Sequence, residues 1–162
     1  MAGATVGELP LFSPPTVPQG WDRMVRLPPG TVWTAVEPVD LDRADRFRAN
    51  VVLTCDDLGG LTFRDWQVAS DEVLPTMLQD YLLVDLERLE IDGAPGGRRL
   101  AHHVDGTGRA LTMEQWFVAG AGFGWTVTAT VETWSYDAVA DGLAEVSAAW
   151  RPLTGTPAAV HP

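Results

Sequence analysis

Few side chains in this sequence have the type and spacing that metal binding requires. Two of the three histidines, His102 and His103, are adjacent in the chain. Adjacent residues of a strand point to opposite faces, so this pair cannot hold one metal ion together. His102 shares its face with Leu100 and Val104, which favours a hydrogen-bonded core or interface histidine over a ligand. We expect no metal site here.

Two pairs of adjacent carboxylates, Asp56-Asp57 and Asp71-Glu72, are the next candidates for chemistry. A calcium loop needs several oxygen ligands at fixed offsets and a terminal bidentate glutamate, and the segment after Asp56-Asp57 lacks them. Neighbouring carboxylates on turns stay hydrated and behave as ordinary acids. The pattern therefore predicts a polar turn at Asp56-Asp57.

A recognisable nucleophile is also missing. No serine lies in a nucleophile-elbow pattern, and the single cysteine, Cys55, alternates with Val51 and Leu53, which indicates a buried, inert thiol. The glycine-rich segment 120–124 connects two strands instead of opening a helix, so it lacks the helix N-terminus that binds phosphate. We expect no catalytic residue, no cofactor and no metal ligand, although an active site assembled from distant residues stays an open alternative.

Composition narrows the classes of partner. The chain has 162 residues, of which 11 are basic and 22 acidic, for a net charge of −11. A field of that sign opposes nucleic acid and anionic membranes and favours a partner with basic or apolar surface. Hydrophobic residues make up 46% of the chain, which is enough for the core of one domain.

The chain divides into a proline-rich N-terminal tail over 1–19, a single domain over 20–152, and a C-terminal tail over 153–162. Within the first tail, Leu9, Leu11 and Phe12 could still dock on the domain. The N-terminus has neither a cationic start nor a long apolar run, and no segment approaches the roughly 20 apolar residues of a membrane span. We expect a cytoplasmic protein without membrane insertion.

The clearest structural pattern runs from Ala110 to Glu132. From Trp125 onward, one side carries apolar residues and the other carries Thr126, Thr128 and Thr130, which is the period-two pattern of a half-buried strand. The segment 111–117 alternates similarly, and the glycines of 119–124 suit a tight reversal. This stretch predicts a long β-hairpin at the centre of a sheet.

Shorter patterns define the other elements. Alternation and turn residues predict strands at 23–27, 32–37, 47–55, 86–92 and 98–104, with turns at 93–97 and 105–108, and a polar connection at 40–45.

Two helices are predicted. The apolar spacing of the last helix covers 136–150. The earlier helix follows from an apolar stripe with helical spacing, with Ser70 as its cap and Asp71-Glu72 near its start. Pro75 either kinks this helix or begins its regular part. That stripe consists of Leu74, Met77, Leu78, Tyr81 and Leu82.

The order is thus three strands, a helix, four strands and a helix. The helices are too few for a parallel sheet, so we expect an α+β fold: one twisted antiparallel sheet of about six to seven strands with flanking helices.

An excess of aromatic residues is the remaining functional signal. Seven tryptophans are present, and tryptophan is enriched at the energetic centres of protein interfaces. Trp116 shares a strand face with Thr112 and Glu114, so we predict that these three residues belong to a partner-binding surface. Core filling is the alternative for any one of the tryptophans.

The whole pattern resembles the Mog1/PsbP-like α/β/α sandwich group, and within it the bacterial DcrB and LpqN-type branch. The features that carry the resemblance are Gly20-Trp21, the early strand FRANVVLT at 47–54, the mid-chain helix, and TVTAT at 126–130 before the last helix. LpqN-like members are typically exported lipoproteins, whereas no lipobox cysteine is found here.

The resemblance implies a non-enzymatic protein-binding adaptor or a secretion-associated chaperone, and it allows a homodimer. Such a protein would use one sheet face or the open sheet edge, and Trp116→Ala would weaken partner capture without unfolding the domain. A small-molecule or lipid carrier with a pocket between sheet and helices is the second hypothesis, and an enzyme is the third.

Overall fold

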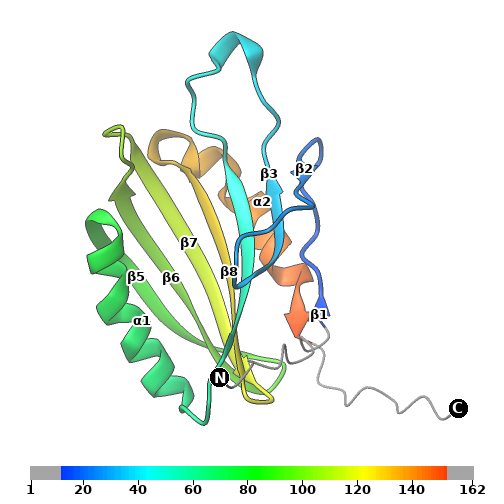
Figure 1. Cartoon of the computed structure of the whole chain (residues 1–162), viewed down its shortest axis with the longest axis vertical. Helices are drawn as coiled ribbons and strands as arrows, with labels where there is room; N and C mark the ends of the chain where they lie inside the picture. Colours follow the sequence, from blue (N-terminus) through cyan, green and yellow to red (C-terminus); the bar gives the residue numbers. More distant parts are fainter. Residues whose placement is uncertain (1–11, 153–162) are drawn as a thin grey trace, which may run out of the picture.

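A computed structural model describes residues 12–152. Seven antiparallel strands form one twisted sheet in the order β2-β3-β4-β8-β7-β6-β5, and the two helices lie on opposite faces of it (Figure 1). A separate pair, β1-β9, joins the two ends of the described chain. The elements are β1 (Phe12–Ser13), β2 (Asp22–Arg23), β3 (Thr31–Val36), β4 (Asn50–Asp57), α1 (Phe63–Met77), β5 (Gln79–Ile91), β6 (Ala94–Val104), β7 (Ala110–Gly120), β8 (Phe123–Glu132), α2 (Tyr136–Ala149), β9 (Arg151–Pro152), and the 3₁₀ turns η1 (Leu41–Arg43) and η2 (Thr133–Ser135).

The central hairpin is confirmed. β7 and β8 pair along their full lengths, with Trp116 opposite Val127. Ala121 and Gly122 form the two-residue reversal, and both have positive φ, 53° and 83°. Two successive positive φ angles are what a tight hairpin turn between right-twisted strands requires. The predicted order of strands and helices, and therefore the α+β sandwich, is also confirmed.

The main core lies between the sheet and α2. Three tryptophans are about 1% exposed there, and the rings of Trp125 and Trp150 are 6.4 Å apart. Phe12 packs on Trp125 with 5.6 Å between ring centroids, so the chain docks on the domain from its first described residue. The buried members of this core are Trp33, Ala35, Ala49, Val51, Leu53, Val118, Trp125, Val127, Ala129, Val131, Leu143, Val146 and Trp150.

The first helix begins earlier than predicted. Thr62 caps it by accepting a hydrogen bond from the backbone N–H of Asp65, and the helix ends at Met77, two residues after Pro75. Ser70 lies inside the helix and donates to the carbonyl of Trp66 instead of acting as a cap. The predicted apolar stripe was wrong because it crosses the helix end, and its last two members lie in β5.

Several strand bounds also differ from the prediction. The expected strand at 23–27 is reduced to β2, β4 begins and ends later than expected, and β5 is longer at its N-terminal side. The reversal between β5 and β6 is tighter than 93–97, because Asp92 and Gly93 make it with φ of 51° and 79°. Pro95 is therefore inside β6, at a position where only β5 is a neighbour, since pairing with β7 begins at Gly96.

Within residues 12–152, no helix is long and apolar enough to cross a membrane. Of the predicted tails over 1–19 and 153–162, the parts at 1–11 and 153–162, with Leu9 and Leu11, lie outside the described residues.

A second, smaller cluster attaches α1 to the other face of the sheet. Trp66, only 8% exposed, packs edge-on to Phe117 with ring centroids 6.2 Å apart. Its ring also lies over Gly124, where an added Cβ would come within 2.6 Å of ring carbons. The absence of a side chain at this position lets the indole approach the strand, so Gly124 determines how closely α1 packs.

Replacing that glycine is expected to weaken the attachment. We predict that Gly124→Ala lowers the free energy of unfolding by about 1–3 kcal/mol, because the new methyl group forces Trp66 from its place. Gly120→Ala is the matched control, since an added Cβ there meets nothing within 4 Å. Urea denaturation of both variants gives the comparison, and equal losses would show that the Trp66 contact is not the cause.

Candidate functional site: the groove beside α1

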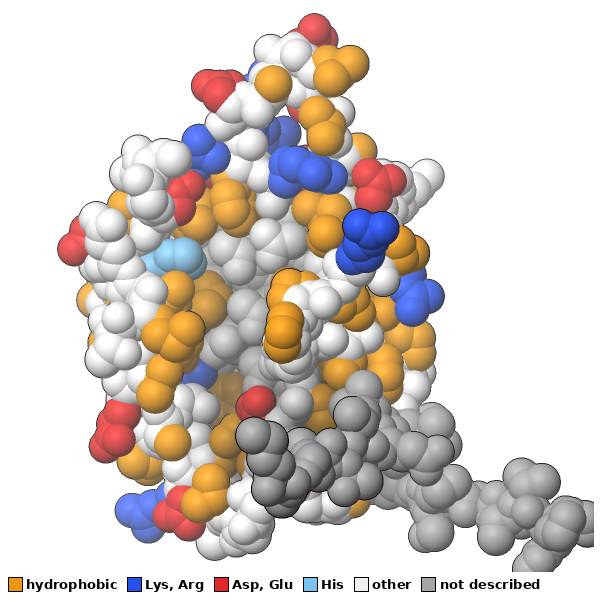
Figure 2. Space-filling view, viewed as in Figure 1, with side chains coloured by type: hydrophobic (Ala, Val, Ile, Leu, Met, Phe, Trp, Pro, Cys, Tyr) orange, Lys and Arg blue, Asp and Glu red, His pale blue; other side chains and the backbone are white. Residues whose placement is uncertain are grey.

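Only part of the sheet face beneath α1 is covered by the helix. α1 lies over the β5 and β6 side, and the face of β4 and β8 stays open (Figure 1). A groove of about 500 Å³ runs between the helix and the open strands, and Figure 2 shows the hollow in the middle of this face. We call it the α1 groove.

The α1 groove has two kinds of surface. Its floor carries the hydroxyl groups of Thr54, Thr126 and Thr128, all half-buried. The wall formed by α1 carries exposed apolar side chains, Val73 at 47% and Met77 at 73%, together with the polar Gln67 and Ser70 toward the Trp66 end. The opposite rim comes from the loop before β3, at 29–30. Hydroxyls below and apolar side chains beside them make the groove amphipathic across its width.

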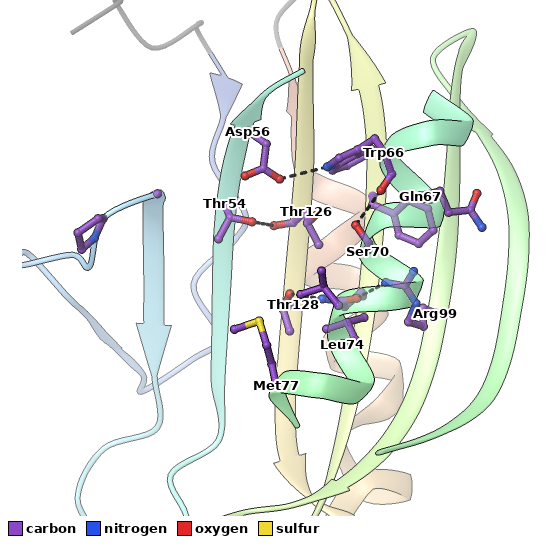
Figure 3. Close-up of a pocket in the computed structure, with 15 residues that line it drawn as sticks. Thr54, Asp56, Trp66, Gln67, Ser70, Leu74, Met77, Arg99, Thr126 and Thr128 are labelled. Atoms are coloured by element: carbon purple, nitrogen blue, oxygen red, sulfur yellow. Dashed lines mark hydrogen bonds between the residues drawn. The ribbon is translucent and has the colours of Figure 1, made fainter. Parts of the chain in front are cut away.

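One end of the groove is formed by Trp66 and Asp56. The indole Nε1 donates to Asp56 Oδ2 at 3.2 Å, which ties α1 to the end of β4 (Figure 3). Asp56 itself is exposed. Met77 and Thr128 lie toward the other end in the same view.

A buried arginine lies on the sheet beneath α1. Arg99, on β6, is 3% exposed and stacks over Phe117 with its guanidinium carbon 5.2 Å from the ring centroid. Its Nη2 donates to Asp71 Oδ1 on α1, and its Nη1 donates to Gln115 Oε1 at 2.6 Å. Because burying an unpaired charge is costly, this guanidinium requires the carboxylate that α1 supplies.

The arginine also connects the helix to the groove floor. Gln115 accepts from Arg99 and, through Nε2, donates to Thr128 Oγ1 at 3.0 Å. A continuous polar chain thus runs from Asp71 on α1 across β6 and β7 to β8. This chain orients the hydroxyl of Thr128.

The predicted partner-binding residues lie on the opposite face, under α2. Thr112 is 1% exposed and its hydroxyl contacts His102 Nδ1 at 2.9 Å. Glu114 is 2% exposed and accepts hydrogen bonds from Arg98 and from the Tyr136 hydroxyl. Burial, followed by the hydrogen bond to Glu114, raises the pKa of Tyr136. These polar side chains are satisfied inside the protein.

Trp116 is the one member of that set with accessible surface. It is half-buried and lines a hollow of about 280 Å³ between the end of β5 and α2, next to Trp150. The role of Trp116, Thr112 and Glu114 in partner binding stays a prediction. The structure brings the three together but separates them from the α1 groove.

Other sequence predictions can be checked here. His102 has the expected hydrogen bond, and Asp57 makes a polar turn by accepting from the backbone N–H of Gly59 at 2.9 Å. Cys55 is half-buried and not fully buried as predicted. Partial burial, followed by the charges of Asp56 and Asp57, raises its pKa to about 11. In residues 12–152, no three His, Cys, Asp or Glu side chains lie together as a metal site would need.

Sequence reasoning included a pocket between sheet and helices only as the carrier alternative, and it did not identify the residues that form the groove. Arg99 and its partner Asp71 are 28 positions apart, and no local pattern connects them. Alternation correctly placed the threonines of β8 on one strand face. It did not show that this face stays open beside a helix. The one available signal was Arg99 itself, a charged residue inside a predicted strand.

The ion pair on α1 gives a testable expectation. We predict that Asp71→Ala lowers the free energy of unfolding by about 1–3 kcal/mol, since it leaves the buried guanidinium unpaired. The loss is smaller than the roughly 3–5 kcal/mol of a fully buried pair because the Asp71 side chain is 37% exposed.

Thermal and urea unfolding measure this effect, with Glu72→Ala as the exposed neighbouring control. Arg99→Met should remove most of the sensitivity, so that Asp71→Ala costs little in that background. An unchanged cost there would mean that Asp71 stabilises α1 without Arg99.

Known proteins resemble this chain in structure and not in sequence. No model of a known protein family matches it, and no curated protein sequence does. Among solved structures, it is similar to LpqN of Mycobacterium tuberculosis, a protein involved in cell envelope biogenesis, with TM-score 0.64 and 14% identity over 90% of this chain and 86% of that one.

Two further structures show the same likeness. Cyanobacterial PsbP (CyanoP) from Synechocystis aligns with TM-score 0.60 and 15% identity over 84% of each chain. PA94 from Pseudomonas aeruginosa, a protein of unknown function, aligns with TM-score 0.62 and 17% identity over 87% of this chain and 90% of that one. The chain therefore has the Mog1/PsbP-like fold, as predicted from its sequence.

Proposed function

We propose that this protein is a non-enzymatic, protein-binding adaptor or secretion-associated chaperone that holds a segment of its partner in the α1 groove. The observation that carries the proposal is the exposed apolar wall of α1, with Val73 and Met77, beside a floor of threonine hydroxyls. The cytoplasm is the expected compartment, and a homodimer stays a prediction.

The two surfaces of the groove suit a polypeptide. Covering the apolar wall contributes about 25 cal/mol per Å² of apolar area removed from water, against which the entropy cost of association is set. The floor hydroxyls can donate hydrogen bonds to, and accept them from, the peptide groups or polar side chains of a bound segment. Those groups of the segment would otherwise lose their hydrogen bonds to water on burial. An amphipathic segment supplies both surfaces at once.

The lining chemistry supports binding over bond-making. Of the described residues that line the groove, only Asp56 and Arg99 carry a charge, and Arg99 is engaged by Asp71 and Gln115. In the described part of the chain, no serine or cysteine in this lining has a neighbouring histidine as base. The net charge of −11 favours partners with a basic surface.

A small-molecule or lipid carrier is the second candidate, and the groove size favours it specifically. Ligand pockets commonly measure roughly 300–1,000 Å³, and the groove of about 500 Å³ lies in that range.

Site-specific crosslinking tests the proposal. In the test variant, the photoreactive residue p-benzoylphenylalanine replaces Val73 in the groove. In the control variant it replaces Asp141, which is exposed on α2. Cells that produce each variant are irradiated before the protein is purified. We expect one protein adduct, of defined mass, from position 73 and none from position 141.

Other outcomes redirect the assignment. A small-molecule adduct at position 73 would establish the carrier instead. Adducts of equal yield at both positions would contradict a groove-bound partner. If Trp116→Ala abolished capture while position 73 gave no adduct, the binding surface would be the hollow beside α2.

A further inference from the structure

The two ends of the α1 groove differ in charge. Asp56 lies at one end and Met77 at the other, with the threonine floor between them (Figure 3). The floor itself is neutral, and the wall near Met77 is apolar. A ligand that follows the strands therefore meets a carboxylate at one end and a hydrophobic surface at the other.

The charge of Asp56 is uncompensated. Only its Oδ2 is used, by the neutral indole of Trp66, and Asp56 makes no ion pair with any other residue of 12–152. The other charge in the lining, Arg99, is 3% exposed and is neutralised by Asp71. Asp57, the next residue of β4, points to the opposite face and does not line the groove, so Asp56 is the exposed charge that the described lining presents at this end.

We infer that the bound segment carries an arginine or lysine at its Asp56 end and apolar side chains along Val73 and Met77, so that it binds in a single direction. This inference rests on the proposed function and names the chemistry of the segment. A cation beside Asp56 gains a charge-assisted hydrogen bond to the carboxylate, whereas the reversed segment would place that cation against Met77. Charge at one end and apolar contact along the wall together fix the orientation.

Peptide selection tests this directly. A random 12-residue peptide library is displayed and selected against four forms of the full chain: the natural protein, Asp56→Asn, Asp141→Asn and Met77→Gln. Asp56→Asn keeps an oxygen acceptor for Trp66 Nε1 and removes the charge alone. Asp141→Asn makes the same change in net charge on α2, away from the groove, and Met77→Gln alters the apolar wall.

We expect apolar residues at regular spacing and a basic residue at one terminus of the peptides selected by the natural protein and by Asp141→Asn. The terminal preference should vanish with Asp56→Asn. For one selected peptide, replacing its basic residue by glutamine should weaken binding about threefold to tenfold in the natural protein and not in Asp56→Asn, and added salt should reduce the difference.

The two ways of failing are distinct. Peptides that require Met77 but show no basic terminus would overturn the charge assignment and leave groove binding intact. Peptides whose recovery is unaffected by Met77→Gln, or no recovered peptide at all, would overturn both the direction of binding and the proposed function.

Discussion

The buried guanidinium of Arg99 determines how this sheet is covered. A charge that is almost fully enclosed must be met by a carboxylate, and Asp71 on α1 meets it. The helix is thereby held over β5 and β6, with Trp66 as its second attachment through Phe117 and Gly124. Because α1 is held to one side, the strands β4 and β8 keep an open face, and the groove follows from that placement.

The two faces of the sheet consequently have different roles. Under α2 the core side chains are apolar and closed, and the buried carboxylate of Glu114 accepts hydrogen bonds from Arg98 and Tyr136. The indole Nε1 of Trp150 is buried there without a hydrogen-bond partner in the described part of the chain. Beside α1 the open strands β4 and β8 present hydroxyls, and the exposed apolar side chains of the groove, Val73 and Met77, belong to the helix. A closed face accounts for stability, and an open face of mixed polarity leaves room for a partner without exposing the core.

The sequence was informative wherever a pattern is local. Alternation in 125–132 and the glycine at 122 predict the central hairpin correctly, since strand period and turn conformation are decided by neighbouring residues. The start of α1 was missed because its cap, Thr62, lies twelve residues before the apolar stripe begins at Leu74. That stripe also continued past the helix end into β5 by coincidence of spacing.

The site was less predictable than the fold. Alternation groups Thr112 and Glu114 on one face of β7 but cannot say that α2 covers this face with hydrogen-bond partners from distant segments. In the same way, nothing near Arg99 in the chain identifies Asp71 as its partner. Burial and long-range pairing are properties of the assembled sheet, and single-strand patterns do not contain them.

Binding in the α1 groove is the central claim, and methyl NMR tests it most directly. With methionine methyls labelled, Met77 reports on the groove, and Met24, 45% exposed beside β2, reports on a distant surface. Adding the partner segment identified by crosslinking should shift the Met77 signal and leave that of Met24 unchanged. A segment that binds while the Met77 signal stays in place would contradict the assignment of the groove.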